Sequence, residues 1–120
     1  MTLQRRSRLA GTREFSNVFQ DAVVSADASF KVLARNTGRS HSRLGMAVSR
    51  QVDKRAVARN RLKRIIRESF RLHYLSDNRQ TPVDIVVLPR RQAVSVCNKR
   101  LFAQLVRHWD RIDRRVSKES

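Results

Sequence analysis

Apolar residues recur every three or four positions in three stretches of the chain, and this period predicts amphipathic helices. The predicted helices cover residues 13–22, residues 54–75, and a last stretch from about 95 or 98 to about 116. The middle helix has a wide apolar stripe, made of Ala58, Leu62, Ile65, Ile66, Ser69, Phe70 and His73. His73 is therefore interpreted as a core histidine. Asp53, just before this helix, is a candidate N-cap.

Other stretches alternate with period two or are continuously β-branched, which predicts strands. These strands cover residues 30–35, 42–50 and 83–88, with a short additional strand at 23–24. The pattern gives the order α-β-β-(β)-α-β-α, an α/β chain. Strand, helix and strand between residues 42 and 88 predict a βαβ crossover around the middle helix.

The strand at residues 42–50 has unequal faces. Leu44, Met46 and Val48 alternate with three small residues, which are Gly45, Ala47 and Ser49. A face made of such small residues leaves room beside it. Either another element packs very close to this face, or it forms a concave surface for a ligand.

The face of the middle helix opposite its apolar stripe is almost wholly cationic. It carries Arg59, Asn60, Arg61, Lys63, Arg64, Arg67 and Arg71, and Arg55 lies just before them. Glu68 could pair with Arg64 or Arg71 at helical spacing, but it cannot neutralise the face. A solvated surface helix is the simpler interpretation. The dominance of arginine, whose planar fork of donors suits phosphates, favours a polyanionic partner.

Composition and charge agree with a single nucleic-acid-binding domain over residues 1–120. The chain has 27 Lys and Arg against 10 Asp and Glu, a formal net charge of +17 that a bound polyanion would relieve. Its one cysteine, Cys97, excludes an internal disulfide, and no apolar stretch is long enough for a signal peptide or a membrane span. We expect a cytoplasmic protein with no membrane association, a flexible basic arm at residues 1–8 and a frayed tail at 117–120.

Several motifs resemble the bacterial ribonuclease P protein subunit. The most specific is Arg59-Asn60-Arg61, followed by Leu62-Lys63-Arg64 and by Arg67-Glu68-Ser69-Phe70-Arg71. Further matches are Arg43-Leu44-Gly45-Met46-Ala47-Val48-Ser49 and Asp84-Ile85-Val86-Val87. The resemblance extends from about residue 8 to about residue 107, and residues 90–100 match least.

The resemblance implies a two-layer α/β sandwich of the ribosomal S5 second-domain type. It implies that the basic helix binds the RNA subunit of ribonuclease P, through Arg55, Arg59, Asn60, Arg61, Lys63, Arg64, Arg67 and Arg71. It also implies a cleft for the single-stranded 5′ leader of precursor tRNA, lined by Phe15, Phe19, Phe30, Gly45, Ala47 and Ser49. On the residues alone, Phe15 and Phe19 are interpreted as core.

By the same resemblance, the RNA subunit hydrolyses precursor tRNA with Mg²⁺, while the protein binds no cofactor alone and needs no other protein partner. The residues agree, because the acids and the histidines His41, His73 and His108 are scattered without the paired spacing of a catalytic or metal site. Two alternatives remain: a ribosomal or other structural RNA-binding protein, and a stand-alone nuclease whose carboxylate or histidine cluster forms only on folding.

Overall fold

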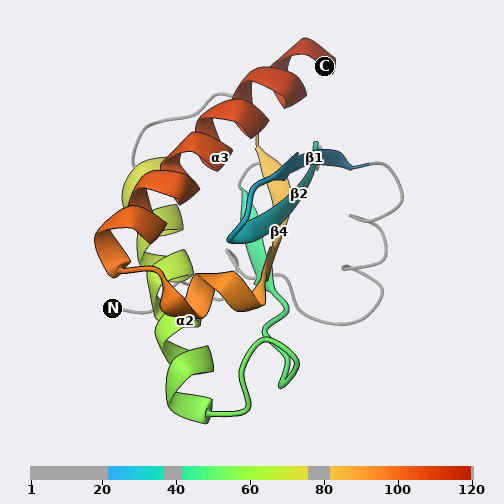
Figure 1. The fold of residues 1–120 in the computed structure, drawn as a ribbon. Coiled ribbons are helices and arrows are strands. Elements are labelled where there is room, and N and C mark those ends of the chain that lie inside the picture. Colours follow the sequence, from blue (N-terminus) through green and yellow to red (C-terminus); the bar gives the residue numbers. More distant parts are fainter. Residues whose placement is uncertain (1–21, 37–41, 76–81, 120) are drawn as a thin grey trace.

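A computed structural model describes residues 22–36, 42–75 and 82–119. The helix predicted at residues 13–22 and the arm at 1–8 lie outside these residues, apart from Ala22. The described chain forms one sheet with helices packed against one of its faces, which confirms the predicted α/β class with two layers (Figure 1).

The sheet has four strands in the order β1-β2-β4-β3. They are β1 (Val23–Ala26), β2 (Phe30–Asn36), β3 (Arg43–Met46) and β4 (Val83–Pro89). β2 pairs antiparallel with both β1 and β4, whereas β3 pairs parallel with β4. The parallel pair confirms the predicted βαβ crossover, because the chain between β3 and β4 contains the basic helix. The short strand predicted at residues 23–24 is confirmed as part of β1.

Two long helices cover one face of the sheet. They are α2 (Ala56–Ser69), which continues as the π-helix η2 (Phe70–Leu75), and α3 (Asn98–Glu119), which follows the short 3-10 helix η3 (Arg91–Ser95). A single core cluster joins Leu62 and Ile66 of α2, Leu105 and Trp109 of α3, and the strand residues that face them. Both helices therefore bury their apolar stripes against the same face of the sheet.

The predicted apolar stripe of α2 is buried, with one difference at its end. Tyr74 is buried at 2% exposure, whereas His73 is only half-buried. The wider turns of η2 rotate the chain less per residue, which brings Tyr74 toward the core. Its ring stacks on Phe70, and both rings meet Trp109 edge-on. His73, interpreted from the sequence as a core histidine, is therefore only partly buried and lies outside the core cluster.

Several predicted boundaries also differ from the observed ones. Strand β3 ends at Met46 instead of residue 50, and α3 continues to Glu119, so the expected frayed tail is helical over most of its length. Asp53 is not the N-cap of α2, a position occupied by Arg55. The carboxylate of Asp53 instead accepts the Arg55 backbone N–H at 2.7 Å.

Candidate nucleic-acid interface

The outer face of α2 presents cations and one amide to solvent. Asn60 and Arg64 are exposed, and Lys63 and Arg67 are half-buried along their stems. Within the described part of the chain, the side chains of these four residues form no hydrogen bond or ion pair. Their polar groups remain available for a ligand because the opposite, apolar side of the helix is packed into the core.

The turn before α2 is held by Asp53. Its carboxylate binds the Arg55 guanidinium through two atoms, at 3.1 Å and 3.0 Å, and the same hydrogen bonds lower the pKa of Asp53. The Arg59 guanidinium donates to the backbone oxygens of Asp53 and Lys54, at 3.0 Å and 2.8 Å. Arg59 therefore shapes the entry into the helix, while the side chain of Arg55 stays 72% exposed.

Arg61 connects α2 to the start of α3. Its Nε donates to Asn98 Oδ1 at 2.9 Å, and its two Nη atoms donate to the backbone oxygens of Val94 at 3.1 Å and Val96 at 2.5 Å. The Arg61 guanidinium thus donates three hydrogen bonds to residues that lie more than thirty positions later in the sequence. We call this set of contacts the Arg61 clamp. The sequence did not predict this clamp, because its acceptors are mostly backbone atoms, and they belong to the segment that matched the family least.

The last predicted cation of the helix, Arg71, is paired. Its guanidinium donates to the Glu68 carboxylate at 2.9 Å, which is one of the two pairings that the spacing predicted. This hydrogen bond lowers the pKa of Glu68. Six of the eight predicted RNA-binding positions therefore lie on α2, with Arg55 just before it and Arg71 in η2, and their side chains differ in their contacts. Asn60, Lys63, Arg64 and Arg67 present their side chains outward, and Arg55, Arg59, Arg61 and Arg71 also form contacts within the protein.

The sheet face opposite the helices carries the small residues singled out in the sequence. Gly45 is buried and lies beside Val86 in the register of β3 and β4, and Ala47 and Ser49 beyond it are exposed. A hollow of about 380 Å³ is lined there by Ala47, Ser49, Gln51, Val52, Leu88, Pro89, Arg90 and Arg91. A neighbouring hollow of about 400 Å³ is lined by Arg50, Gln51, Lys54 and Arg91. Of the two alternatives for this strand, a concave surface is the one found at Ala47 and Ser49.

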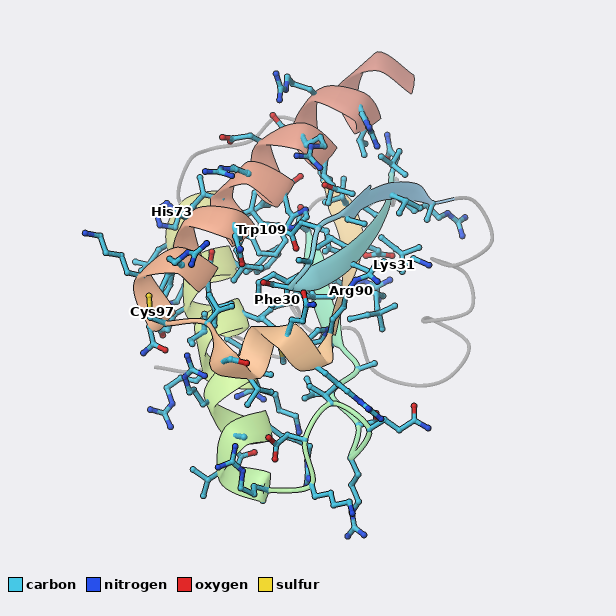
Figure 2. All side chains as sticks on the ribbon, in the orientation of Figure 1. Phe30, Lys31, His73, Arg90, Cys97 and Trp109 are labelled. Atoms are coloured by element: carbon cyan, nitrogen blue, oxygen red, sulfur yellow. The ribbon has the colours of Figure 1, made fainter. Side chains whose placement is uncertain are left out.

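The cations beside these hollows were not identified as site residues from the sequence. Arg90 and Arg91 follow β4 directly, and Arg91 Nε donates to the Gln51 backbone oxygen at 2.7 Å. Lys31 and Arg90 are exposed and point away from the helices (Figure 2). The Arg90-Arg91 pair after a buried strand is the signal that would have predicted this basic rim.

Of the three phenylalanines predicted to line a leader cleft, the structure describes only Phe30. The prediction for Phe30 is wrong, because its ring is 0% exposed and packs edge-on against His108, between the sheet and α3 (Figure 2). It shares the helix-covered face with Val32 and Ala34, whereas Gly45 lies on the other face. Phe15 and Phe19 lie outside the described residues, so their role remains a prediction.

One serine, histidine and aspartate meet on folding, which bears on the nuclease alternative. Ser25 Oγ lies 2.7 Å from His108 Nδ1, and His108 Nε2 lies 2.9 Å from Asp27 Oδ2. Arg111 donates to Ser25 Oγ at 3.0 Å, so Ser25 donates onward to Nδ1, and Nε2–H donates to Asp27. Burial lowers the pKa of His108, and the neighbouring Asp27 carboxylate opposes this shift. Ser25 and His108 are each 1% exposed, so no reactant can reach them, and the arrangement joins α3 to β1.

The other acidic side chains do not form a metal site within the described ranges. No group of three or more His, Cys, Asp or Glu side chains in residues 22–36, 42–75 and 82–119 is placed to hold a metal ion. Asp84 instead forms a buried, two-atom ion pair with Arg43, at 2.9 Å and 2.8 Å. Cys97 is an exposed free thiol. In the same ranges, no helix is long and apolar enough to cross a membrane.

Comparison with known proteins relates this geometry to one family. The family model described as Ribonuclease P matches residues 3–113. The chain is 44% identical over 116 residues to the ribonuclease P protein component of Methylococcus capsulatus, covering 97% of this chain and 88% of that relative. It is 40% identical over 110 residues to the Vibrio cholerae protein of the same description, covering 92% and 91%.

Solved structures show the same likeness in three dimensions. The RNase P protein from Thermotoga maritima superposes with a TM-score of 0.76 at 33% identity, covering 88% of this chain and 96% of that one. The RNase P protein of Staphylococcus aureus gives a TM-score of 0.77 at 29% identity, covering 88% and 94%.

Proposed function

Because this chain belongs to the ribonuclease P protein family, we propose that the outer face of α2 binds the RNA subunit of ribonuclease P. Members of this family are protein components of an endoribonuclease that serves in tRNA processing. The observation that carries the proposal is the row of outward side chains on α2: Asn60, Lys63, Arg64 and Arg67, with Arg55 and Arg71 at its two ends. Such a face suits an RNA backbone, which binds guanidinium and ammonium groups by charge and hydrogen bonding.

The protein's own packing supports a binding role for this face. The core holds α2 on its apolar side, and the Arg61 clamp fixes the helix against the segment before α3. The outward cations are therefore presented on a rigid element, so less conformational entropy is lost when they bind. Arg59 and Arg61 are assigned mainly to shaping this element, because their guanidinium groups already donate to the protein.

We further propose that the opposite face of the sheet binds the single-stranded 5′ leader of precursor tRNA. Ala47 and Ser49 line the hollow at the ends of β3 and β4, and the cations Arg90 and Arg91 border it. An unstacked strand could lie against small side chains while its phosphates meet these cations. Phe15 and Phe19 would supply the stacking surfaces.

In this proposal the RNA subunit performs the hydrolysis with Mg²⁺, and the protein provides affinity for RNA and precursor. Four acidic side chains are already engaged with protein cations or histidine: Asp27 with His108, Asp53 with Arg55, Glu68 with Arg71, and Asp84 with Arg43. Purified protein with Mg²⁺ and precursor tRNA should therefore yield no site-specific cut until the RNA subunit is added. Cleavage by the RNA-free protein, lost in one Asp→Ala variant, would contradict this assignment.

The α2 face is tested with the double variant Arg64→Gln and Arg67→Gln. Because each lost phosphate contact removes about one unit of salt slope, affinity for the RNA subunit should fall and the slope should decrease by about 2. The melting temperature should hardly change, since neither side chain has a partner in the described structure. The matched control is Lys31→Gln with Arg90→Gln, which removes the same charge from the other side of the sheet. Equal losses in the two variants, or none in either, would contradict the proposed site.

The leader surface is tested with Ala47→Leu, which fills part of the hollow from an exposed position. We expect the holoenzyme to bind leader-bearing precursor more weakly and mature tRNA unchanged. Val57→Leu is the control, because Val57 is 82% exposed on α2, away from this hollow. Equal losses for precursor and mature tRNA would count against a leader site at this face.

A further inference from the structure

The outer side of α3 carries a second row of cations. Arg100, Arg107 and Arg114 are exposed, and their spacing of seven residues is close to two helical turns, so they form a line along the helix. Lys99, next to Arg100 in the first turn of the helix, is also exposed. Within the described part of the chain, none of these four side chains forms a hydrogen bond or an ion pair.

The other two arginines of this helix, Arg111 and Arg115, differ from this row. Arg111 donates to Ser25, and Arg115 donates to the backbone oxygen of Val24. They therefore attach α3 to β1. Two arginines of α3 therefore bind other parts of the protein, and three are exposed to solvent. The cationic residues of α2 also include both kinds.

The row on α3 lies toward the side of the helix that meets β1, whereas Trp109, which meets α2, lies on the other side. The two helices pack together, joined by the Arg61 clamp and by a 2.8 Å hydrogen bond from Trp109 Nε1 to Ser69 Oγ. Both cover the same side of the sheet, so their outer sides turn away from it together (Figure 1). At 1.5 Å per residue, the line from Arg100 to Arg114 is about 21 Å long. Together the helices present cations over an area wider than one helix.

We propose that this row on α3 is a second contact surface for the RNA subunit, separate from the α2 face. The inference rests on the proposed function, since it extends the footprint of the same partner. RNA fits the row because phosphates are spaced closely along a backbone and arginine binds them with paired donors. An acidic membrane fits less well, since the apolar side of α3, including Leu101, Leu105 and Trp109, is 0% exposed and cannot enter lipid.

The test is the triple variant Arg100→Gln, Arg107→Gln and Arg114→Gln, which we call the α3 variant. Binding of the RNA subunit is measured over a range of salt concentrations. If all three cations contact phosphates, the salt slope should decrease by about 2–3. Melting of the free protein should stay within about 2 °C of the parent, because these side chains have no structural partner in the described chain.

The matched control removes three exposed cations from elsewhere, by Lys31→Gln, Arg50→Gln and Arg90→Gln, and only its binding to the RNA subunit alone is compared, because Arg90 borders the proposed leader surface. It separates a local contact from the general effect of net charge. An equal loss in the control and the α3 variant would overturn the inference, as would an α3 variant that binds like the parent. If the α2 double variant loses affinity and the α3 variant does not, the proposed function stands and this inference fails.

A second measurement locates the RNA. Ala103 is exposed between Arg100 and Arg107, so Ala103→Cys in a Cys97→Ser background can carry a tethered iron chelate. Hydroxyl radicals from this site should cut the bound RNA subunit at a few discrete positions. The absence of cuts, or cuts only in precursor tRNA, would overturn the assignment to the RNA subunit. Binding to phosphatidylglycerol vesicles that depends on the α3 cations, with RNA binding unchanged, would overturn it as well.

Discussion

Replacing Arg61 by alanine separates a structural role from an RNA contact at one position of the basic helix. The residue belongs to the Arg-Asn-Arg motif and lies at the edge of the cationic face of α2. Its guanidinium nevertheless donates to Val94, Val96 and Asn98. We expect Arg61→Ala to weaken the attachment between α2 and the start of α3, and to affect RNA binding mainly through that change.

The magnitude follows from the environment of the three hydrogen bonds. A hydrogen bond from a charged group contributes about 1.5–3 kcal/mol when buried, and less where water can replace it. Arg61, Val94 and Val96 are half-buried and Asn98 is exposed, so the acceptors are partly rehydrated after the change. We expect a total loss of about 2 kcal/mol in the free energy of unfolding. For a chain of 120 residues this corresponds to a fall of about 6–10 °C in melting temperature.

The assay is thermal unfolding together with salt-dependent binding of the RNA subunit, on Arg61→Ala and on Arg64→Ala. The two variants should give opposite patterns. Arg61→Ala should melt lower with a salt slope close to the parent's, and Arg64→Ala should melt like the parent with a slope reduced by about 1. Arg61→Lys should recover little stability, because one ammonium cannot span three acceptors. An Arg61→Ala protein that melts within 1–2 °C of the parent, with its slope reduced by about 1, would refute the clamp.

Two other predictions concern buried charge. The folded chain holds the pKa of His108 below its ordinary value, so stability from this group is fully present above about pH 6.5 and is lost as pH falls further. Urea denaturation between pH 5 and 7 should show this loss as a fall in the free energy of unfolding of at most about 1.4 kcal/mol per pH unit. In the His108→Gln variant the free energy of unfolding should depend less on pH. A variant with the same pH dependence as the parent would show that His108 is not its source. Arg43→Met should cost about 3–5 kcal/mol, because it leaves the Asp84 carboxylate, whose side chain is 12% exposed, without its cation. Adding Asp84→Leu should restore most of that stability in the same denaturation assay, and a double variant as unstable as the single one would contradict the explanation.

The sequence predicted those features that depend on local periodicity. The stripe from Ala58 to Phe70 is buried because helical geometry alone places these residues on one side. The alternation along the strand grouped Gly45, Ala47 and Ser49 on one face and left two alternatives, a closely packed element or a concave surface; the structure has a hollow at Ala47 and Ser49. The period did not predict that Tyr74 lies in the core, because it contains neither the change to wider turns at Phe70 nor the contacts of Phe70 and Tyr74 with Trp109.

Features that depend on distant segments could not be predicted. Alternation groups Phe30 with Val32 and Ala34, but it does not say which face of the sheet the helices cover. The hydrogen-bond chain from Arg111 through Ser25 and His108 joins residues 83 positions apart. The Arg61 clamp likewise depends on where the segment before α3 is placed, and its acceptors leave no pattern among side chains.

The strand order also determines when the fold can be completed during synthesis. Strands β1 and β2 are neighbours in sequence and can pair as a hairpin as soon as both exist. β3 pairs only with β4 among the described strands, and β4 is made after the whole of α2 and η2. At 5–20 residues per second, the roughly 40 intervening residues take about 2–8 s to synthesise. During that interval the hydrogen-bonding groups of β3 have no strand partner, and the repulsion between the many positive charges of the nascent chain opposes its association with other chains.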